Sequence, residues 1–308
     1  FVEKKFRDST FISLRKLFII LTTSILFLIF LSFYLPSSQK LIYPKILLDI
    51  KNQTWFTTKQ FFKPCFQRKN IFCTYGEKDN QETIFLVGDS IMASMQEELR
   101  LSLKNRNKNF IIMTNAGCDF LILDKRLKQD QYCKSKIQKQ REIKIKKHKN
   151  STIIMHLNYK NLGEQNINLN LFLSNVNKYL KLDYKIILIY PIPQFSSNVS
   201  DLIYELYNKD KKNFLKNILK KENHIKLSFD EFVNDTKYVY KSFDKLKHKN
   251  LHRVFPESIF CNQVIKGKCL GNSSEDIYFI DASHLSKKGS NMINVNLIKV
   301  IDQIYSNN

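Results

Sequence analysis

The sequence predicts an α/β domain built on a parallel sheet, preceded by one transmembrane helix. Two observations predict this fold class. A run of 19 residues without charge, Leu17 to Leu35, lies near the start of the chain. From Glu82 onward, short apolar runs of strand length alternate with stretches whose apolar residues recur at helical spacing. Such alternation is typical of a parallel sheet with helices on both faces.

The uncharged run is long enough to cross a bilayer. At 1.5 Å per residue, a helix of this length reaches about 28 Å, close to the thickness of the hydrocarbon core. A buried core helix would have a polar face, and a signal peptide would be followed by an A-x-A-like cleavage site; neither is present. Because positive charge stays in the cytoplasm, the chain after Leu35 is expected outside it. The basic residues before the run are Lys4, Lys5, Arg7, Arg15 and Lys16.

The chain therefore divides into four parts. Residues 1–16 form a short basic lead, residues 17–35 span the membrane, residues 36–80 form an extended linker, and residues 81–308 form the α/β domain. The first residue is Phe1 rather than Met, so we expect the chain to be part of a longer protein.

The six cysteines fall into three local pairs. Metal sites usually have C-x2-C spacing or nearby histidines, which these cysteines lack, so no metal site is predicted. An even number of cysteines at short separations in an exported domain favours disulfides. The expected pairs are Cys65 with Cys73, Cys118 with Cys133, and Cys261 with Cys269.

The elements of the domain follow from hydrophobic periodicity. Short apolar runs predict strands at Thr83–Val87, Phe110–Met113, Thr152–Leu157, Lys185–Tyr190 and Tyr278–Ile280. Apolar stripes at helical spacing predict helices at Ile91–Leu103, Asn168–Leu182 and Ser286–Tyr305.

The chain is strongly basic, with 50 Lys and Arg against 28 Asp and Glu. Such an excess favours an anionic partner, such as nucleic acid, lipid headgroups or acidic glycans. Nucleic acid is disfavoured, because the domain is expected outside the cytoplasm and has no aromatic-interleaved basic motif. The stretch Lys134–Lys149 is expected to be a solvated helix face, with contact to an acidic polysaccharide or headgroups as the alternative.

Ser90 directly follows the first strand, in the stretch IFLVGDSIMASM. Sites in parallel sheets form at the carboxyl ends of strands, so Ser90 is expected to be a nucleophile. The alternative is that it only caps the next helix. Asp281 and His284 stand three residues apart near the other end of the domain. This spacing allows His284 to accept the Ser90 proton while Asp281 orients the imidazole.

Acyl transfer also needs hydrogen-bond donors for an oxyanion. The candidates are the backbone N–H of Ser90, the backbone N–H of Gly117 in the loop NAGC, and the side chain of Asn158. Gly117 could instead serve only a turn. Asn158 could instead bond only to its own loop.

The order GDS, a Gly loop, an Asn loop and D-x-x-H resembles the SGNH hydrolase superfamily over about residues 83–306. The resemblance implies a three-layer, flavodoxin-like fold. It also implies that Ser90 is the nucleophile, that Gly117 and Asn158 complete the oxyanion hole, and that Asp281 and His284 complete the triad. The third block of that family usually reads G-x-N, and here His156 stands in place of the Gly.

A narrower resemblance covers further segments. FVEKKFRD, residues 1–8, is similar to the E-K-P-F-R segment before the last helix of the acyltransferase family 3 membrane domain, with Lys5 in place of Pro. YPIP at residues 190–193 and CNQVIKGKC at residues 261–269 resemble proteins in which that membrane domain is fused to an SGNH domain. Residues 1–16 are then expected to be the cytoplasmic end of such a membrane domain.

The resemblance implies a bacterial O-acyltransferase in the inner membrane, with its SGNH domain in the periplasm. The acyl group is expected to be acetyl, supplied by acetyl-CoA through the membrane domain. The acceptor is expected to be a hydroxyl of a surface polysaccharide, such as lipopolysaccharide O-antigen or an exopolysaccharide. No cofactor is expected to bind to this part of the protein. A carbohydrate esterase or deacetylase with the same triad, and a non-catalytic membrane-anchored module that binds glycans, are the alternatives.

Overall fold

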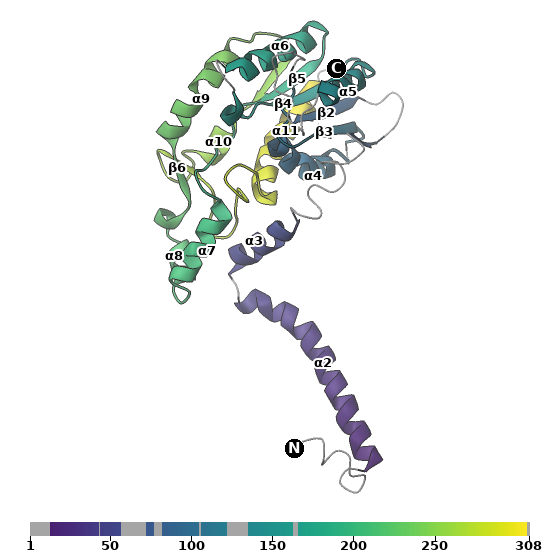
Figure 1. Cartoon of the computed structure of the whole chain (residues 1–308), viewed down its shortest axis with the longest axis vertical. Coiled ribbons are helices and arrows are strands. Elements are labelled where there is room, and N and C mark those ends of the chain that lie inside the picture. The colour runs from purple at the N-terminus through teal and green to yellow at the C-terminus, as the bar shows by residue number, and fades with distance from the viewer. Residues whose placement is uncertain are drawn as a thin grey trace. The chain divides into compact units, whose positions relative to one another are not determined.

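The computed structural model describes residues 13–42, 44–56, 72–76, 82–104, 106–121, 135–162 and 166–306 (Figure 1). The chain divides into two compact units, Phe1–Leu48 and Asp49–Asn308. The helix α3 (Lys45–Phe56) runs across the boundary between them.

The first unit contains the long apolar helix α2 (Leu14–Ile42). Its segment Arg15–Phe33 is long and apolar enough to cross a membrane, and none of it is buried inside the protein. The hydroxyls of Thr22, Thr23 and Ser32 donate to backbone carbonyls three or four residues earlier, at 2.7–3.0 Å. Because these hydroxyls are satisfied within the helix, they suit an apolar surrounding.

The second unit is built on a six-stranded sheet with the order β1-β3-β2-β4-β5-β7. β1 is antiparallel to β3, and all the other pairs are parallel. In chain order the five parallel strands are arranged 2-1-3-4-5, which is the flavodoxin-like order with its switch point between β2 and β4. The strands are β1 (Cys73–Tyr75), β2 (Thr83–Gly88), β3 (Asn109–Thr114), β4 (Thr152–His156), β5 (Lys185–Ile189) and β7 (Leu251–Val254).

The central strands end together at one edge of the sheet. β2, β3 and β4 are buried along their whole length, as their continuous apolar runs predicted. Val87 is in register with Met113 of β3 and with Met155 of β4. The loops that follow these three strands therefore start side by side.

Helices cover both faces of the sheet (Figure 1). The β2–β3 and β4–β5 connections run in opposite directions along the sheet, so right-handed crossovers place α4 (Ser90–Lys104) and α6 (Ile167–Lys181) on opposite faces. α11 (Lys287–Ser306) packs against α4. α9 (Phe229–Asp244) packs against α6, where the ring centroids of Phe172 and Phe243 lie 5.7 Å apart. The predicted three-layer fold is confirmed.

Several short elements complete the second unit. A small antiparallel sheet joins β6 to β8, and the disulfide Cys261–Cys269 anchors β8. These elements are α7 (Val199–Lys209), α8 (Phe214–Ile218), β6 (Lys226–Ser228), α10 (Glu257–Phe260) and β8 (Lys268–Leu270).

One predicted disulfide is confirmed, Cys261 with Cys269. Cys73 and Cys118 are also disulfide-bonded. Their expected partners, Cys65 and Cys133, lie outside the described residues.

The strand predicted at Tyr278–Ile280 is wrong. Phe279 forms only an isolated bridge with Leu285, and the fifth parallel strand is β7. β7 reads Leu-His-Arg-Val, and its two central residues are half-exposed because it lies at the edge of the sheet. It therefore lacks the apolar run by which buried strands are found.

Two further predictions need correction. The linker predicted at residues 36–80 is not simply extended, because it contains the end of α2, the whole of α3 and the strand β1. The basic stretch Lys134–Lys149 forms the helix α5 (Ser135–Lys146), whose lysines are exposed or half-exposed as expected, but the opposite face of the helix is buried, which was not predicted. The buried residues of α5 are Gln138, Arg141 and Ile145, two of them polar, so the stretch shows no clear apolar stripe.

The start of α11 is fixed by a close backbone contact. The hydroxyl of Ser286 accepts a hydrogen bond from the N–H of Gly289 at 3.0 Å, and the N–H of Ser286 donates to the carbonyl of Tyr278 at 2.9 Å. Gly289 passes so close to Tyr278 that a Cβ at this position would overlap the Tyr278 carbonyl oxygen.

We expect Gly289→Ala to destabilise the second unit by about 3 kcal/mol or more, because the overlapping atom belongs to the backbone and cannot rotate away. Thermal unfolding followed by circular dichroism measures the effect. Val295→Ala, at an exposed position of the same helix, is the control and should leave the melting temperature nearly unchanged. Equal melting temperatures for the two variants would contradict the close contact.

Candidate active site

The turn between β2 and α4 presents Ser90. The carboxylate of Asp89 accepts hydrogen bonds at Oδ1 from the N–H groups of Ile91 and Met92, at 3.0 and 3.4 Å. Asp89 is buried, with 1% of its surface exposed, whereas Ser90 is half-buried. Asp89 thus caps α4, and the hydroxyl of Ser90 is left for another partner.

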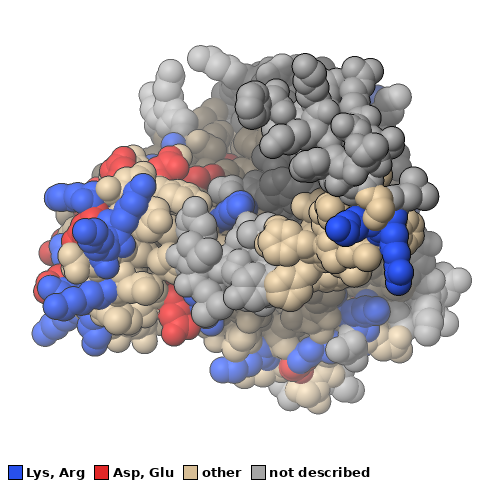
Figure 2. Space-filling model, turned by 90° about the horizontal axis from the view of Figure 1, so that it is seen from below, with Lys and Arg blue, Asp and Glu red and all other residues tan. Residues whose placement is uncertain are grey.

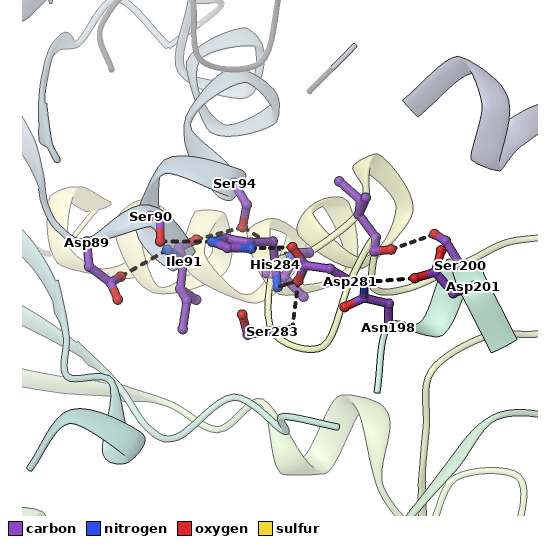
Figure 3. A network of polar contacts seen from close by, with 12 residues as sticks. Asp89, Ser90, Ile91, Ser94, Asn198, Ser200, Asp201, Asp281, Ser283 and His284 are labelled. Atoms are coloured by element: carbon purple, nitrogen blue, oxygen red, sulfur yellow. Dashed lines mark hydrogen bonds and ion pairs between the residues drawn. The ribbon is translucent and has the colours of Figure 1, made fainter. Parts of the chain in front are cut away.

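That partner is His284 (Figure 3). Its Nε2 lies 2.8 Å from the Ser90 hydroxyl oxygen, and its Nδ1 lies 2.6 Å from Oδ2 of Asp281. The other oxygen of Asp281 accepts hydrogen bonds from the N–H groups of Ser283 and His284, at 2.8 and 2.7 Å. The D-x-x-H loop therefore folds so that the carboxylate and the imidazole face each other. In this arrangement the hydroxyl can lose its proton to the imidazole.

Neighbouring elements hold this loop in place. The N–H of Leu285 donates to the hydroxyl of Ser94 on α4 at 3.3 Å. From the segment after β5, the N–H of Phe195 donates to the carbonyl of Ala282 at 2.7 Å, and the hydroxyl of Ser200 donates to the carbonyl of Ile280 (Figure 3).

Electrostatics prepare His284 to hold a proton. Burial would lower the pKa of His284, but the hydrogen bond and the negative charge of Asp281 outweigh it, and the pKa is raised above the ordinary 6.5. The charge of Asp89 acts in the same direction. Burial would raise the pKa of Asp281, but its hydrogen bonds with His284 lower it below 3.8, so this carboxylate stays ionised at neutral pH.

Asn158 follows β4 at the switch point of the sheet. Its Oδ1 accepts hydrogen bonds from Gln194 Nε2 at 2.9 Å and from the N–H of Lys160 at 3.0 Å. Its Nδ2 donates to Oδ2 of Asp89 at 3.4 Å. Two donors at Oδ1 assign the amide orientation and turn the NH₂ group towards the Asp89–Ser90 turn. Asn158 therefore does more than bond to its own loop.

His156 does not displace Asn158, although it stands where the family usually has Gly. The imidazole is buried, and its Nδ1 donates to the carbonyl of Ile189 on the neighbouring strand at 3.3 Å. Burial lowers its pKa, so this histidine is neutral at neutral pH.

Gly117 lies in a tight turn after β3. The N–H of Cys118 donates to the carbonyl of Asn115 at 3.2 Å, and Gly117 has a φ of 55°, in the left-handed region that favours glycine. The N–H of Asn115 donates to the carbonyl of Gly88 at 3.1 Å, which ties this turn to the strand that leads to Ser90. The role of Gly117 as an oxyanion donor stays a prediction.

The structure adds residues that the motifs did not single out. Asp89 had a local signal, since an acid directly before a helix is a common cap. Gln194 follows the YPIP segment and is buried against Asn158. Its contact spans 36 positions of sequence, so no local pattern marks it.

A flavodoxin-like sheet with a serine, a histidine and an aspartate joined at its switch point is the arrangement that the SGNH resemblance implied. The family model described as the SGNH domain (fused to AT3 domains) matches residues 59–297, and the chain belongs to this family.

Several solved structures are similar to the chain, and no curated protein matches it. The periplasmic domain of a lipopolysaccharide acetyltransferase from Salmonella ser. Paratyphi A shares the fold, with a TM-score of 0.54 and 17% identity over 82% of this chain and 97% of that chain. A putative platelet activating factor from Streptococcus pneumonia has a TM-score of 0.41 and 14% identity, over 73% of this chain and 85% of that chain.

We expect the His284 imidazole to titrate above pH 6.5. Asp281→Asn should lower its midpoint, because the effect of burial, which lowers the pKa, is then no longer outweighed by the negative charge of Asp281. Long-range ¹H–¹⁵N NMR of the imidazole nitrogens measures both midpoints. His252 is an internal control, since burial and Lys185 lower its pKa in either protein. A His284 midpoint below that of His252 in the unmodified protein would contradict the Asp281 contact.

Proposed function

We propose that the second unit is a serine-dependent O-acyltransferase that passes an acyl group through Ser90 to a hydroxyl of a cell-surface polysaccharide. The observation that carries the proposal is the hydrogen-bonded series Ser90–His284–Asp281 at the carboxyl edge of the sheet. Membership of the SGNH family fused to AT3 domains supports acyl transfer. The similar Salmonella domain belongs to a lipopolysaccharide acetyltransferase, which supports acetyl as the group and a glycan as the acceptor.

In the first half-reaction, the Ser90 oxygen attacks the carbonyl carbon of the acyl donor while His284 Nε2 takes the hydroxyl proton. The resulting oxyanion is stabilised by the N–H groups of Ser90 and Gly117 and by Nδ2 of Asn158. The imidazolium then gives its proton to the leaving group, and the acyl group remains as an ester on Ser90. Ionised Asp281 stabilises the imidazolium while it exists.

In the second half-reaction, a sugar hydroxyl replaces the leaving group. His284 takes the proton of this hydroxyl as its oxygen attacks the Ser90 ester. The new tetrahedral oxyanion occupies the same donors. Its collapse returns the proton to the Ser90 oxygen and releases the acylated sugar, so the enzyme is regenerated without change.

The acyl donor is proposed to be acetyl-CoA in the cytoplasm. An acyltransferase-3 membrane domain would move the acetyl group across the inner membrane to Ser90, and this portion of the protein would bind no cofactor of its own. In this proposal α2 spans the bilayer, and the preceding basic residues keep its N-terminal end in the cytoplasm. The second unit then lies in the periplasm, where disulfides such as Cys261–Cys269 persist.

The charge of the surface suits an acidic acceptor. The formal net charge of the chain is +22. Figure 2 shows Lys and Arg side chains gathered on the side where Figure 1 has α7, α8 and β6. An anionic polysaccharide would be attracted to such a surface. The exposed lysines from α7 to β6 are Lys209, Lys211, Lys212, Lys216, Lys220, Lys221 and Lys226.

Two alternatives use the same structure differently. A carbohydrate esterase would pass the acyl group from Ser90 to water instead of to a sugar. A non-catalytic, membrane-anchored glycan-binding module would use the lysine-rich surface and leave the triad idle. The bond between Ser90 and His284 counts against the second alternative, because an idle hydroxyl needs no aligned base.

Incubation of the full chain in detergent with p-nitrophenyl acetate should produce a protein that is one acetyl group heavier by intact mass. Ser90→Ala should remove the adduct and lower kcat/KM by about 10⁴-fold or more, because the nucleophile is lost. Ser102→Ala is the matched control, since this hydroxyl on α4 donates to the carbonyl of Glu98 in its own helix and, among the described residues, makes no contact with the site.

Addition of an acetylatable oligosaccharide should move the acetyl group from Ser90 to the sugar. Release to water alone, unaffected by the sugar, would favour the esterase. Unmodified protein that reacts no faster than Ser90→Ala would contradict both enzymes.

Asn158→Ala should lower kcat for the same ester by about 10²- to 10³-fold, because one oxyanion donor is removed. Gln194→Ala should have a smaller effect in the same direction, since it frees the orientation of the amide but keeps its NH₂ group. Steady-state kinetics of both variants are compared with Asn161→Ala, which changes an exposed asparagine nearby. An unchanged kcat for Asn158→Ala would assign the oxyanion to other donors.

A further inference from the structure

Arg141 on α5 joins the two backbone segments that meet at the site. Its side chain is fully buried. One terminal nitrogen donates to the carbonyl of Gly88 at 2.8 Å, and the other donates to the carbonyl of Cys118 at 3.0 Å. Gly88 lies two residues before Ser90, and Cys118 directly follows Gly117. A single guanidinium therefore spans the approach to the nucleophile and the loop of a proposed oxyanion donor.

Gln138, one turn earlier on α5, supports the same loop. Its Nε2 donates to the carbonyl of Asp119 at 2.6 Å, and its Oε1 accepts a hydrogen bond from Arg141 at 3.4 Å. Arg141 also lies 3.3 Å from the Asp119 carbonyl. The buried face of α5 thus holds two consecutive carbonyls of the loop after β3, while Asn158 bonds through its N–H to the side chain of Asp119 at 3.2 Å.

Stability alone gives little reason for an arginine at this position. Burial lowers the pKa of Arg141 to about 10, although the charges of Asp119 and Asp89 raise it in part. The Nε atom is buried with no hydrogen-bond partner among the described residues. Apolar side chains often replace buried charges without loss of stability. A guanidinium differs from an apolar side chain at this position because its two terminal nitrogens lie in one plane and can hold two carbonyls at a fixed spacing.

We propose that Arg141 is a positioning residue for acyl transfer, which sets the spacing between the Ser90 turn and the Gly117 loop. The inference rests on the proposed function, since the spacing matters only if both segments donate to one oxyanion. Arg141 touches no substrate and acts through the backbone. A lysine at this position keeps the charge but cannot hold the two carbonyls at the same spacing, because all donors of an ammonium lie on one nitrogen instead of two.

The test compares Arg141→Lys with unmodified full chain in detergent, using p-nitrophenyl acetate. We expect kcat to fall by about 100-fold with KM within about twofold, because a shift of about 1 Å in the donors affects the transition state more than ground-state binding. The rate at which a fluorophosphonate modifies Ser90 should fall in parallel, since its tetrahedral oxygen uses the same donors. Arg253→Lys is the matched control: this half-buried arginine donates to the carbonyl of Leu246 at 2.6 Å, and its loss should lower the melting temperature but leave kcat unchanged.

Gln138→Met provides a second variant without a change of charge. It removes the hydrogen bonds of Gln138 with the Asp119 carbonyl, Cys118 Sγ and Arg141. It should lower kcat about tenfold at constant KM, so it decides the question if Arg141→Lys does not fold. The proposal is overturned if Ser90→Ala is inactive while the folded Arg141→Lys, or Gln138→Met in its place, keeps the kcat of the unmodified protein. A protein whose activity does not depend on Ser90 would overturn the proposed function itself, and this inference with it.

Discussion

The geometry of the site depends on the hydrogen bonds that the Asp89 carboxylate accepts. A helix that starts at Ser90 needs an acceptor for its first N–H groups, and a nucleophile at the same position needs a free hydroxyl. Asp89 resolves this conflict because Oδ1 caps α4 while Oδ2 accepts from Asn158. Its charge also raises the pKa of His284. The buried side chain of Asp89 thus bonds to both α4 and Asn158, and its charge acts on His284.

Local patterns predicted the residues of the Ser90–His284–Asp281 series and most of the sheet. TIFLV, FIIM and TIIM are buried on both faces, so their apolar runs were sufficient. In D-x-x-H the carboxylate and the imidazole are three positions apart, so their contact is local, whereas GDS was found by its place at the end of a buried strand. β7 was not predicted, because an edge strand can carry polar residues at its centre and then lacks an apolar run. The burial of Arg141 was not predicted, because the sequence around a buried arginine in a lysine-rich stretch looks the same as that around a solvated one. Such positions depend on contacts that the tertiary fold creates.

The site is surrounded by buried ionisable groups, and one of them is shifted towards its neutral form. Asp89, Asp119 and Arg141 are all buried. Both carboxyl groups lie close enough to the guanidinium to raise its pKa. Burial, and then the charge of Asp89, raise the pKa of Asp119 well above its ordinary value. A carboxyl group driven towards its neutral form avoids the penalty of a second buried anion.

Ser90 and His284 are separated by 194 positions along the chain. If the domain is exported unfolded and N-terminal end first, Ser90 reaches the far side of the membrane long before His284. In the proposed mechanism, Ser90 would lack its base and attack no ester until the segment after β8, which carries His284, has emerged. With the proposed function, the long separation would delay reactivity during export: a half-exported chain would not hydrolyse acyl donors, and activity would begin only with the completed domain.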